Sequence, residues 1–337
     1  MDEPVPGTQA WLDLVVEDVI EPELPIVDPH HHLWPPDGAL PYGLTELHAD
    51  VSCGHRVVQT VFVECHAAYR TDRPAELASV GETEFVAGQA GLDEPPLIAG
   101  IVARADLRLP HLDDVLDAHE AAAGGLLRGI RDALSHAELP EALTIRGRAP
   151  KDLYLDPSFR AGLARLGRRG LTYDSWHYHY QNREFLELAR AVPGTTMVLD
   201  HFGTPLGVGP YAAQREEIFA QWQRDIEEIA RCENVVAKLG GLAMVDNGFG
   251  WDTAPRPATS DELIAAQGRY YLHAIECFGP QRCMFESNFP IDRRSLSYRT
   301  VWNAFKKLTA GCSADERTTM FSGTARRVYR LPGEAAS

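Results

Sequence analysis

Long apolar segments are missing from this sequence. None of its runs approaches the about 20 consecutive apolar residues that a helix needs to span a bilayer. Residues 1–6 also lack the basic region followed by an apolar region that marks a secretory signal. We therefore expect no membrane partner and a cytoplasmic location.

Basic charge and paired cysteines are scarce as well. Lys and Arg total 32 against 48 for Asp and Glu, and the formal net charge is −16 at pH 7. This charge disfavours binding to nucleic acid or to an anionic membrane, so we expect no nucleic-acid partner. The six cysteines form no C-x-x-C pair, and we expect reduced thiols in the cytosol.

What the sequence does contain is a regular alternation of strand-like and helix-like segments. We predict eight strands, at residues 25–28, 57–64, 97–103, 127–131, 171–176, 195–200, 234–239 and 282–286. Helical patterns follow at residues 112–123, 157–169, 183–191, 215–231 and 260–278, and a last one runs from about 298 to 328 with a break at Ala310 and Gly311. Eight such units favour a single (β/α)8 barrel, also called a TIM barrel.

The barrel is expected to cover residues 24–333, with an N-terminal arm at 1–23 and a tail at 334–337. An open doubly wound sheet is the alternative architecture. That fold has a glycine-rich phosphate-binding turn after its first strand, where this chain has histidines instead. The barrel is therefore the better prediction.

The first predicted strand ends in the most informative stretch of the chain, Asp28-Pro29-His30-His31-His32-Leu33-Trp34. Side chains alternate along a strand, so His30 and His32 point the same way. Two imidazoles on one face beside an aspartate suit a divalent metal. An affinity-tag remnant is disfavoured, because the run lies inside the chain and follows a strand pattern.

The other strand ends carry the same kinds of side chain. In a (β/α)8 barrel the carboxyl ends of all strands form the active site. Six of the 13 histidines fall at predicted strand ends, namely His30, His32, His66, His177, His179 and His201. Charged residues lie there too: Glu64, Arg104, Asp106, Arg131, Asp200, Lys238 and Glu286. Each alone could be structural, but their concentration favours one site.

Neutral imidazole together with carboxylate suits Zn, Mn or Fe. We predict one or two divalent ions, with His30, His32 and His201 as the core ligands and Glu64, His179 and Asn288 as further candidates. Arg131 and Lys238 are expected near the rim, where a cation suits a substrate carboxylate or a developing oxyanion. Three further side chains complete the predicted substrate pocket: Trp34, Trp176 and His177.

Three motifs together resemble the amidohydrolase superfamily. They are D-x-H-x-H at residues 28–32, D-H-F-G-T-P at residues 200–205 and S-N-F-P at residues 287–290. The resemblance covers about residues 24–333 and is closest to the branch that includes 2-pyrone-4,6-dicarboxylate lactonase and sugar-lactone hydrolases. It implies a (β/α)8 barrel. Many members use a metal to activate water against a lactone, amide or ester, others decarboxylate aromatic acids, and some lactonases of the branch use no metal.

The chain departs from this family at one position. The family carries an aspartate at the eighth strand that binds metal and takes the proton from water, and Asn288 stands there. An amide has no useful basicity, so hydrolysis needs another base: Glu64, Glu286, His179 or His201, or a metal that acidifies the water. Asp292 is a weaker candidate, because Pro290 intervenes and a residue past the strand is harder to aim inward.

Three functions remain open from the sequence. The leading one is metal-dependent hydrolysis of a lactone, ester or amide in a small organic acid that Arg131 orients. The alternative is a dinuclear non-heme iron monooxygenase, since Glu64, the histidines and Asn288 resemble the few superfamily members that activate dioxygen. A non-catalytic binding protein is the third. We expect a small-molecule partner that carries a carboxylate, and a homo-oligomer is left open.

Overall fold

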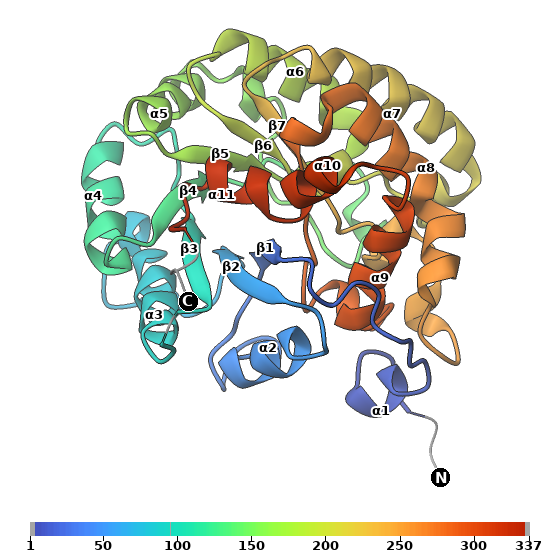
Figure 1. Ribbon diagram of the computed structural model, residues 1–337. Coiled ribbons are helices and arrows are strands. Elements are labelled where there is room, and N and C mark those ends of the chain that lie inside the picture. The colour runs from blue at the N-terminus through green and yellow to red at the C-terminus, as the bar shows by residue number, and fades with distance from the viewer. Residues whose placement is uncertain (1–3, 95, 334–337) are drawn as a thin grey trace.

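The computed structural model describes residues 4–94 and 96–333, so the predicted tail and residues 1–3 of the arm lie outside the described residues. Its strands form one parallel eight-stranded sheet in sequence order (Figure 1). They are β1 (Ile26–His31), β2 (Val57–Val63), β3 (Ile98–Ala103), β4 (Leu127–Arg131), β5 (Thr172–Ser175), β6 (Met197–Leu199), β7 (Val235–Leu239) and β8 (Cys283–Phe285). All eight predicted strands are confirmed.

The sheet closes on itself just beyond β8. His32 N–H donates to the carbonyl of Phe289 at 2.8 Å, and Asn288 N–H donates to the carbonyl of His30 at 3.0 Å. These bonds join the residues after β8 to β1, and a parallel bridge pairs His31 with Phe289. The predicted (β/α)8 barrel is therefore confirmed.

Each strand is followed by a helix on the outside of the barrel (Figure 1). The ring consists of α2 (Leu44–Val51), α3 (Val80–Ala90), α4 (Leu112–Ala123), α5 (Pro157–Arg168), α6 (Asn182–Ala191), α7 (Arg215–Ala230), α8 (Ser260–Phe278) and α9 (Tyr298–Leu308). The predicted break at Ala310 and Gly311 separates α9 from α10 (Ala314–Thr318), which continues through a π-helical turn, Thr319–Gly323, into α11 (Thr324–Val328).

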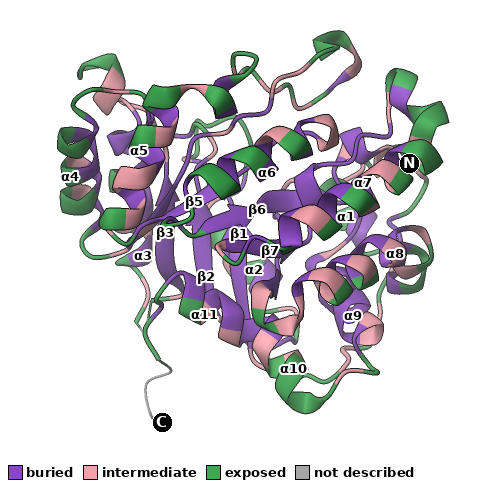
Figure 2. Cartoon of the chain, turned by 90° about the horizontal axis from the view of Figure 1, so that it is seen from above, coloured by how far each residue is buried: buried purple, intermediate pink, exposed green. Residues whose placement is uncertain are grey.

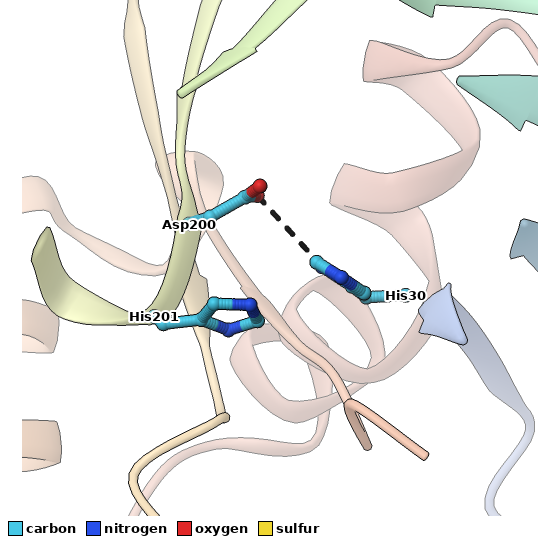
Figure 3. Close-up of side chains that lie close together, drawn as sticks. All are labelled: His30, Asp200 and His201. Carbon is cyan, nitrogen blue, oxygen red and sulfur yellow. Dashed lines mark ion pairs between the residues drawn. The ribbon is translucent and has the colours of Figure 1, made fainter. Parts of the chain in front are cut away.

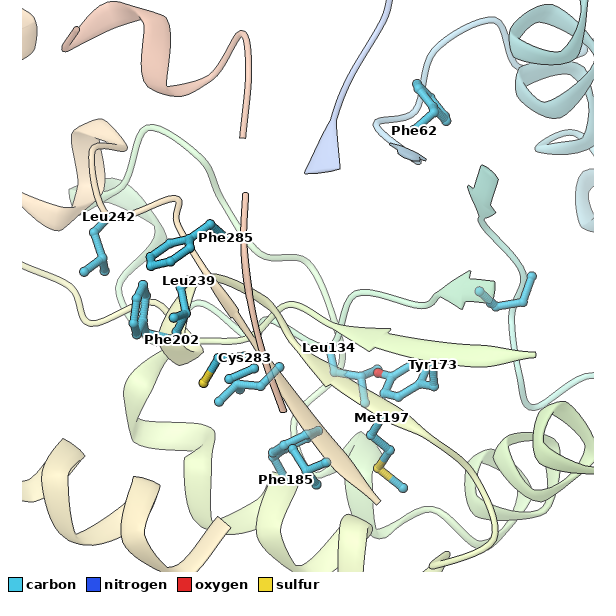
Figure 4. Close-up of a cluster of buried hydrophobic side chains, with 14 of the residues drawn as sticks. Phe62, Leu134, Tyr173, Phe185, Met197, Phe202, Leu239, Leu242, Cys283 and Phe285 are labelled. Atoms are coloured by element: carbon cyan, nitrogen blue, oxygen red, sulfur yellow. The ribbon is translucent and has the colours of Figure 1, made fainter. Parts of the chain in front are cut away.

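Two apolar layers form the core. The larger lies between strands and helices and contains Phe202, Leu239 and Phe285 (Figure 4). The smaller lies inside the barrel, where strand valines pack against Val328 and Tyr329 at the end of α11. Figure 2 shows the strands as almost entirely buried beneath the helices. The C-terminal segment thus fills one end of the barrel, and the polar strand ends face the other.

The N-terminal arm packs against the barrel. It contains α1 (Gln9–Leu12), whose Trp11 is fully buried and donates from its indole nitrogen to the carbonyl of Ala254 at 3.3 Å. Farther along, Ile20 N–H donates to the side chain of Asn303 on α9 at 2.9 Å. No helix within the described ranges combines the length and apolar character needed to cross a membrane.

Candidate active site

A polar layer lies directly above the apolar interior of the barrel. Asp200, Lys238 and Glu286 each come two residues after a buried apolar residue of the interior, on β6, β7 and β8 respectively. Because side chains on a strand alternate, all three point into the barrel. Each is completely buried, so each needs a polar partner there.

Glu286 holds two histidines through its two oxygens. Its Oε2 lies 2.7 Å from Nδ1 of His30, and its Oε1 lies 2.7 Å from Nδ1 of His201. Nδ1 of His30 also lies 3.3 Å from the ammonium of Lys238, whereas Nδ1 of His201 donates to Glu286, a carboxylate that only accepts hydrogen bonds when ionised. Such a partner fixes the tautomer and orientation of an imidazole and leaves its Nε2 for another role.

His32 is fixed in the same tautomer by the backbone. Its Nδ1 donates to the carbonyl of Val63 at 2.8 Å, and its Nε2 lies 3.3 Å from Nε2 of His30. Burial lowers the pKa of His32 to about 3, and burial together with the nearby Lys238 holds the pKa of His30 well below its usual value. Both rings are therefore neutral, and their two Nε2 atoms face each other.

This arrangement fits a metal ion. A cation bound between these two nitrogens would be held by both imidazoles. His30, Asp200 and His201 also offer ligand atoms that all lie within 4.8 Å of one another (Figure 3). Imidazole nitrogen and carboxylate oxygen are ligands typical of Zn, Mn and Fe. We call His30, His32, His201 and Glu286 the imidazole floor.

Lys238 lies elsewhere than the sequence suggested. It is fully buried, and its ammonium donates to Asp174 on β5 at 2.7 Å and lies 3.1 Å from Asp200. The hydroxyl of Tyr329 donates to the same oxygen of Asp174. The prediction of a rim position that meets substrate is therefore corrected: β7 directs Lys238 inward, where carboxylates take its hydrogen bonds. The role of Asp174 was missed, although a carboxylate within a buried strand is a signal for such a partner.

Arg131 and Glu64 form a second charged group beside the floor. Arg131 Nε donates to Glu64 Oε1 at 2.8 Å, and its Nη1 lies 3.4 Å from Nε2 of His30. The other oxygen of Glu64 lies 3.1 Å from Nδ1 of His66. Burial alone would raise the pKa of Glu64, but the charges of Arg131 and His66 hold it at about 2. Both oxygens of Glu64 are thus engaged by cationic or N–H donors.

The side chain of Asn288 is hydrogen-bonded to a carboxylate, that of Asp292. Its side-chain amide donates to Asp292 at 2.8 Å, and the other oxygen of Asp292 accepts from the amide of Ala243 at 3.2 Å. Burial raises the pKa of Asp292 to about 7, against the opposing effect of His201. The expectation that Pro290 would keep Asp292 from pointing inward is corrected: a turn places Asp292 at the start of the short helix Asp292–Arg294, against Asn288.

Backbone strain gathers at this end of the barrel. His66, His201 and Asn288 all have φ between 52° and 63°. Residues other than Gly rarely adopt this left-handed backbone conformation. A glycine also makes room for the floor, because a Cβ on Gly241 would lie 2.1 Å from Nδ1 of His201. Strain of this kind persists where the surrounding structure enforces it, and it clusters at functional sites.

Two predicted site histidines are not brought to the floor. His177 lies between Ser175 and Asn182, 3.0 Å from each, and its ring packs on Phe185 of α6. The ring of His179 packs against aromatic side chains, and its Nδ1 accepts from the amide of Leu206 at 3.3 Å. Neither residue lines the cavity in the described part of the chain. The structure thus places both apart from His30 and His32.

A cavity of about 610 Å³ opens above the imidazole floor. His32, His201 and Asn288 line it at the bottom, and Trp34 and Trp176 contribute apolar wall. Within the described residues, the loop 136–153 contributes lining residues, whereas the loops 205–214 and 245–260 contribute none. Arg131 and Glu64 also line the cavity, together with four further arginines.

Comparisons with known proteins agree with this geometry. The chain is 32% identical to an uncharacterized protein of Sinorhizobium fredii, y4mH, over 92% of this chain and 99% of that one. It is 27% identical to L-fucono-1,5-lactonase of Burkholderia multivorans, over 76% of this chain and 83% of that one. A crystal structure of an amidohydrolase from Burkholderia multivorans with bound zinc matches with a TM-score of 0.71 and 26% identity, over 91% of this chain and 99% of that one.

The family follows from a longer match. A family model described as amidohydrolase matches residues 27–331, which include all of the barrel's strands except Ile26, the first residue of β1, and the whole imidazole floor. The resemblance inferred from the strand-end motifs is thereby confirmed, and this chain belongs to the amidohydrolase family.

Proposed function

We propose that this protein hydrolyses a lactone, or a related ester or amide, of a small organic acid with the help of a divalent metal. The observation that carries the proposal is the imidazole floor, in which the rings of His30, His32 and His201 lie together beneath one cavity and Nδ1 of His32 and of His201 is bound to an acceptor. The 27% identity to a lactonase supports lactones as the first class to test.

His30, His32 and Asp200 are the residues that would hold the metal, which when bound would polarise the substrate carbonyl and lower the pKa of water. His201 is kept out of this set, because its one free nitrogen, Nε2, serves as the base. Glu64 is no longer proposed as a ligand, because Arg131 and His66 engage both of its oxygens. We also leave out His179, which packs away from the floor.

The base that Asn288 cannot supply is assigned to His201 and Glu286. Glu286 accepts from Nδ1 of His201, so Nε2 is the atom that takes a proton from the attacking water. Burial by itself lowers the pKa of His201, but the negative charge of Glu286 overrides it and raises that pKa. Glu286 therefore stabilises the imidazolium that forms and orients it for return of the proton to the leaving oxygen.

Arg131 and Asn288 position the substrate. Arg131 is held by Glu64 and presents Nη1 beside His30, where a guanidinium stabilises a carboxylate or a developing oxyanion. Asn288 is held by Asp292 at the cavity surface, and its amide can hydrogen-bond to water or substrate without acting as a base.

The test is turnover of a panel of sugar and aromatic lactones by protein purified without added metal, with metal content measured by elemental analysis. We expect ring opening under anaerobic conditions and loss of activity after chelation, with recovery on addition of a divalent ion. Product formed only with dioxygen, together with two irons per chain, would instead support the monooxygenase. The monooxygenase hypothesis depended on Glu64 as an iron ligand, whereas in the structure the two carboxylate oxygens of Glu64 face Arg131 and His66.

A further inference from the structure

The cavity is much more basic than the protein around it. Five arginines line it, against two carboxylates, Glu64 and Asp132, although the whole chain carries a formal charge of −16. One of the five, Arg131, belongs to the floor region. The other four, which we call the arginine mouth, are Arg104, Arg108, Arg146 and Arg148.

The mouth comes from two loops. Arg104 and Arg108 follow β3. The guanidinium group of Arg104 pairs with Asp132 at 3.0 Å, and that of Arg108 pairs with Asp106 at 2.8 Å. Arg146 and Arg148 lie in the loop after β4, which a bridge between His136 and Arg148 and the bonds of Asp246 to the amides of residues 144 and 145 hold in place.

The second pair of arginines is not neutralised. Arg146 donates from Nε to the carbonyl of Leu143 at 3.1 Å, which orients its guanidinium but leaves its charge. In the ranges 4–94 and 96–333, neither Arg146 nor Arg148 forms an ion pair with a carboxylate. Two positive charges therefore stand at the cavity opening with hydrogen-bond donors to spare, and arginine binds carboxylate and phosphate through paired donors.

We propose that the substrate is an organic polyanion, in which one anionic group binds at the mouth to Arg146 and Arg148 while the bond to be cleaved lies at the imidazole floor. This inference rests on the proposed function and names its substrate class. The distal group is a carboxylate or a phosphate, since both match a guanidinium pair. The body between the two ends lies against Trp34 and Trp176, in a cavity of about 610 Å³ that suits a small molecule.

Titration calorimetry with unreactive probes tests this proposal without any turnover. The probes are butyrate as the monoanion, glutarate as the dicarboxylate of similar length, and 3-phosphonopropionate for a phosphate-like distal group. We expect a dianion to bind about tenfold or more tightly than butyrate, since a charge-assisted hydrogen bond contributes more than 1.4 kcal/mol. A preference for glutarate identifies a carboxylate, and a preference for the phosphonate identifies a phosphate.

The matched variants are Arg146→Gln/Arg148→Gln and Arg168→Gln, the last an exposed arginine at the end of α5 outside the cavity lining. The double variant should lose most of the dianion advantage while butyrate binding changes little, and the control variant should keep it. If the double variant does not fold, Arg148→Gln alone serves, with a smaller loss expected. Equal binding of butyrate and dianions by the wild type, or undiminished dianion binding by the double variant, would overturn the proposal.

The outcome is separable from that of the proposed function. Strong dianion binding without hydrolysis of any lactone would overturn the reaction and keep the mouth as an anion site. Rapid hydrolysis of uncharged lactones together with weak dianion binding would keep the proposed reaction and overturn the mouth as an anion site.

Discussion

The imidazole floor and the arginine mouth belong to one cavity but are built in opposite ways. The floor comes from strand ends, its side chains are at most 4% exposed, and Nδ1 of both His32 and His201 has a defined acceptor. The mouth comes from loops, three of its four arginines are exposed, and its guanidinium groups keep free donors. The contrast indicates that the reaction is fixed by the barrel, whereas substrate choice resides in two loops that can vary without disturbing it.

The largest effect is expected from removal of a floor imidazole. His30→Ala and His201→Ala should each lower kcat by about 10³-fold or more, because each removes a partner of Glu286 and a metal or proton site. Steady-state kinetics on the hydrolysed lactone, with circular dichroism to check the fold, provides the measurement. His119→Ala is the control, since this buried histidine lies on α4 and should affect stability alone. Collapse of the fold in both floor variants would mean that these histidines are structural.

Beneath the floor, Lys238→Met should cost stability. The substitution leaves Asp174 and Asp200 buried without their shared ammonium, and breaking a buried ion pair costs about 3–5 kcal/mol. Chemical denaturation would show a reduced free energy of unfolding with an unchanged m-value. A loss below about 1 kcal/mol, the range of exposed pairs, would show that water reaches this layer.

At the mouth, the double variant Arg146→Gln/Arg148→Gln should change recognition without changing chemistry. For an anionic substrate we expect KM to rise about tenfold and kcat to stay within about twofold, because these side chains do not touch the floor histidines and act through uniform binding. Initial-rate measurements at several salt concentrations would separate the two parameters. A matching fall in kcat would place these arginines in the transition state and remove the distinction between mouth and floor.

A milder change is expected at the border between the two regions. Asn288→Asp places a carboxylate at the cavity surface just after β8, and a latent hydrolase should then gain about two- to tenfold in kcat from an added general base. The new charge also faces Asp292, whose pKa is already about 7, so the gain should appear on the alkaline side of the pH–rate profile. No gain at any pH would indicate that the site is adjusted to an amide at this position.

The smallest effect concerns His66, which lines the cavity and is exposed. Its bond to Glu64 raises its pKa above the usual 6.5, so its stabilising contribution is present below about pH 6.5 and is lost as pH rises through the folded-state pKa. His66→Gln should therefore lower stability by less than about 1 kcal/mol, and only on the acidic side. Thermal unfolding should show a lower Tm for the variant than for the wild type at pH 6 and equal Tm values at pH 9.

The fold and the approximate place of the site could be predicted well because local pattern carries them. Alternation along β1 put His30 and His32 together, and the apolar runs located every strand. The same rule, applied strictly to β5, would also have separated Trp176 from His177. Asp174 and Trp176 lie on the inner side, so His177 must face α6, and His179 already belongs to the short helix His179–Gln181.

The sequence by itself determined the barrel, the histidines at its strand ends and the asparagine that follows its eighth strand, since each is a property of residue order and strand period. Only the tertiary structure decided which groups pair. It placed Glu286 between two imidazoles, drew Lys238 to Asp174 and Asp200, engaged Glu64 with Arg131, and gathered four arginines from two loops. Such partners lie far apart along the chain, and burial decides among them, because a charge removed from water must find whichever partner the closed barrel brings within reach.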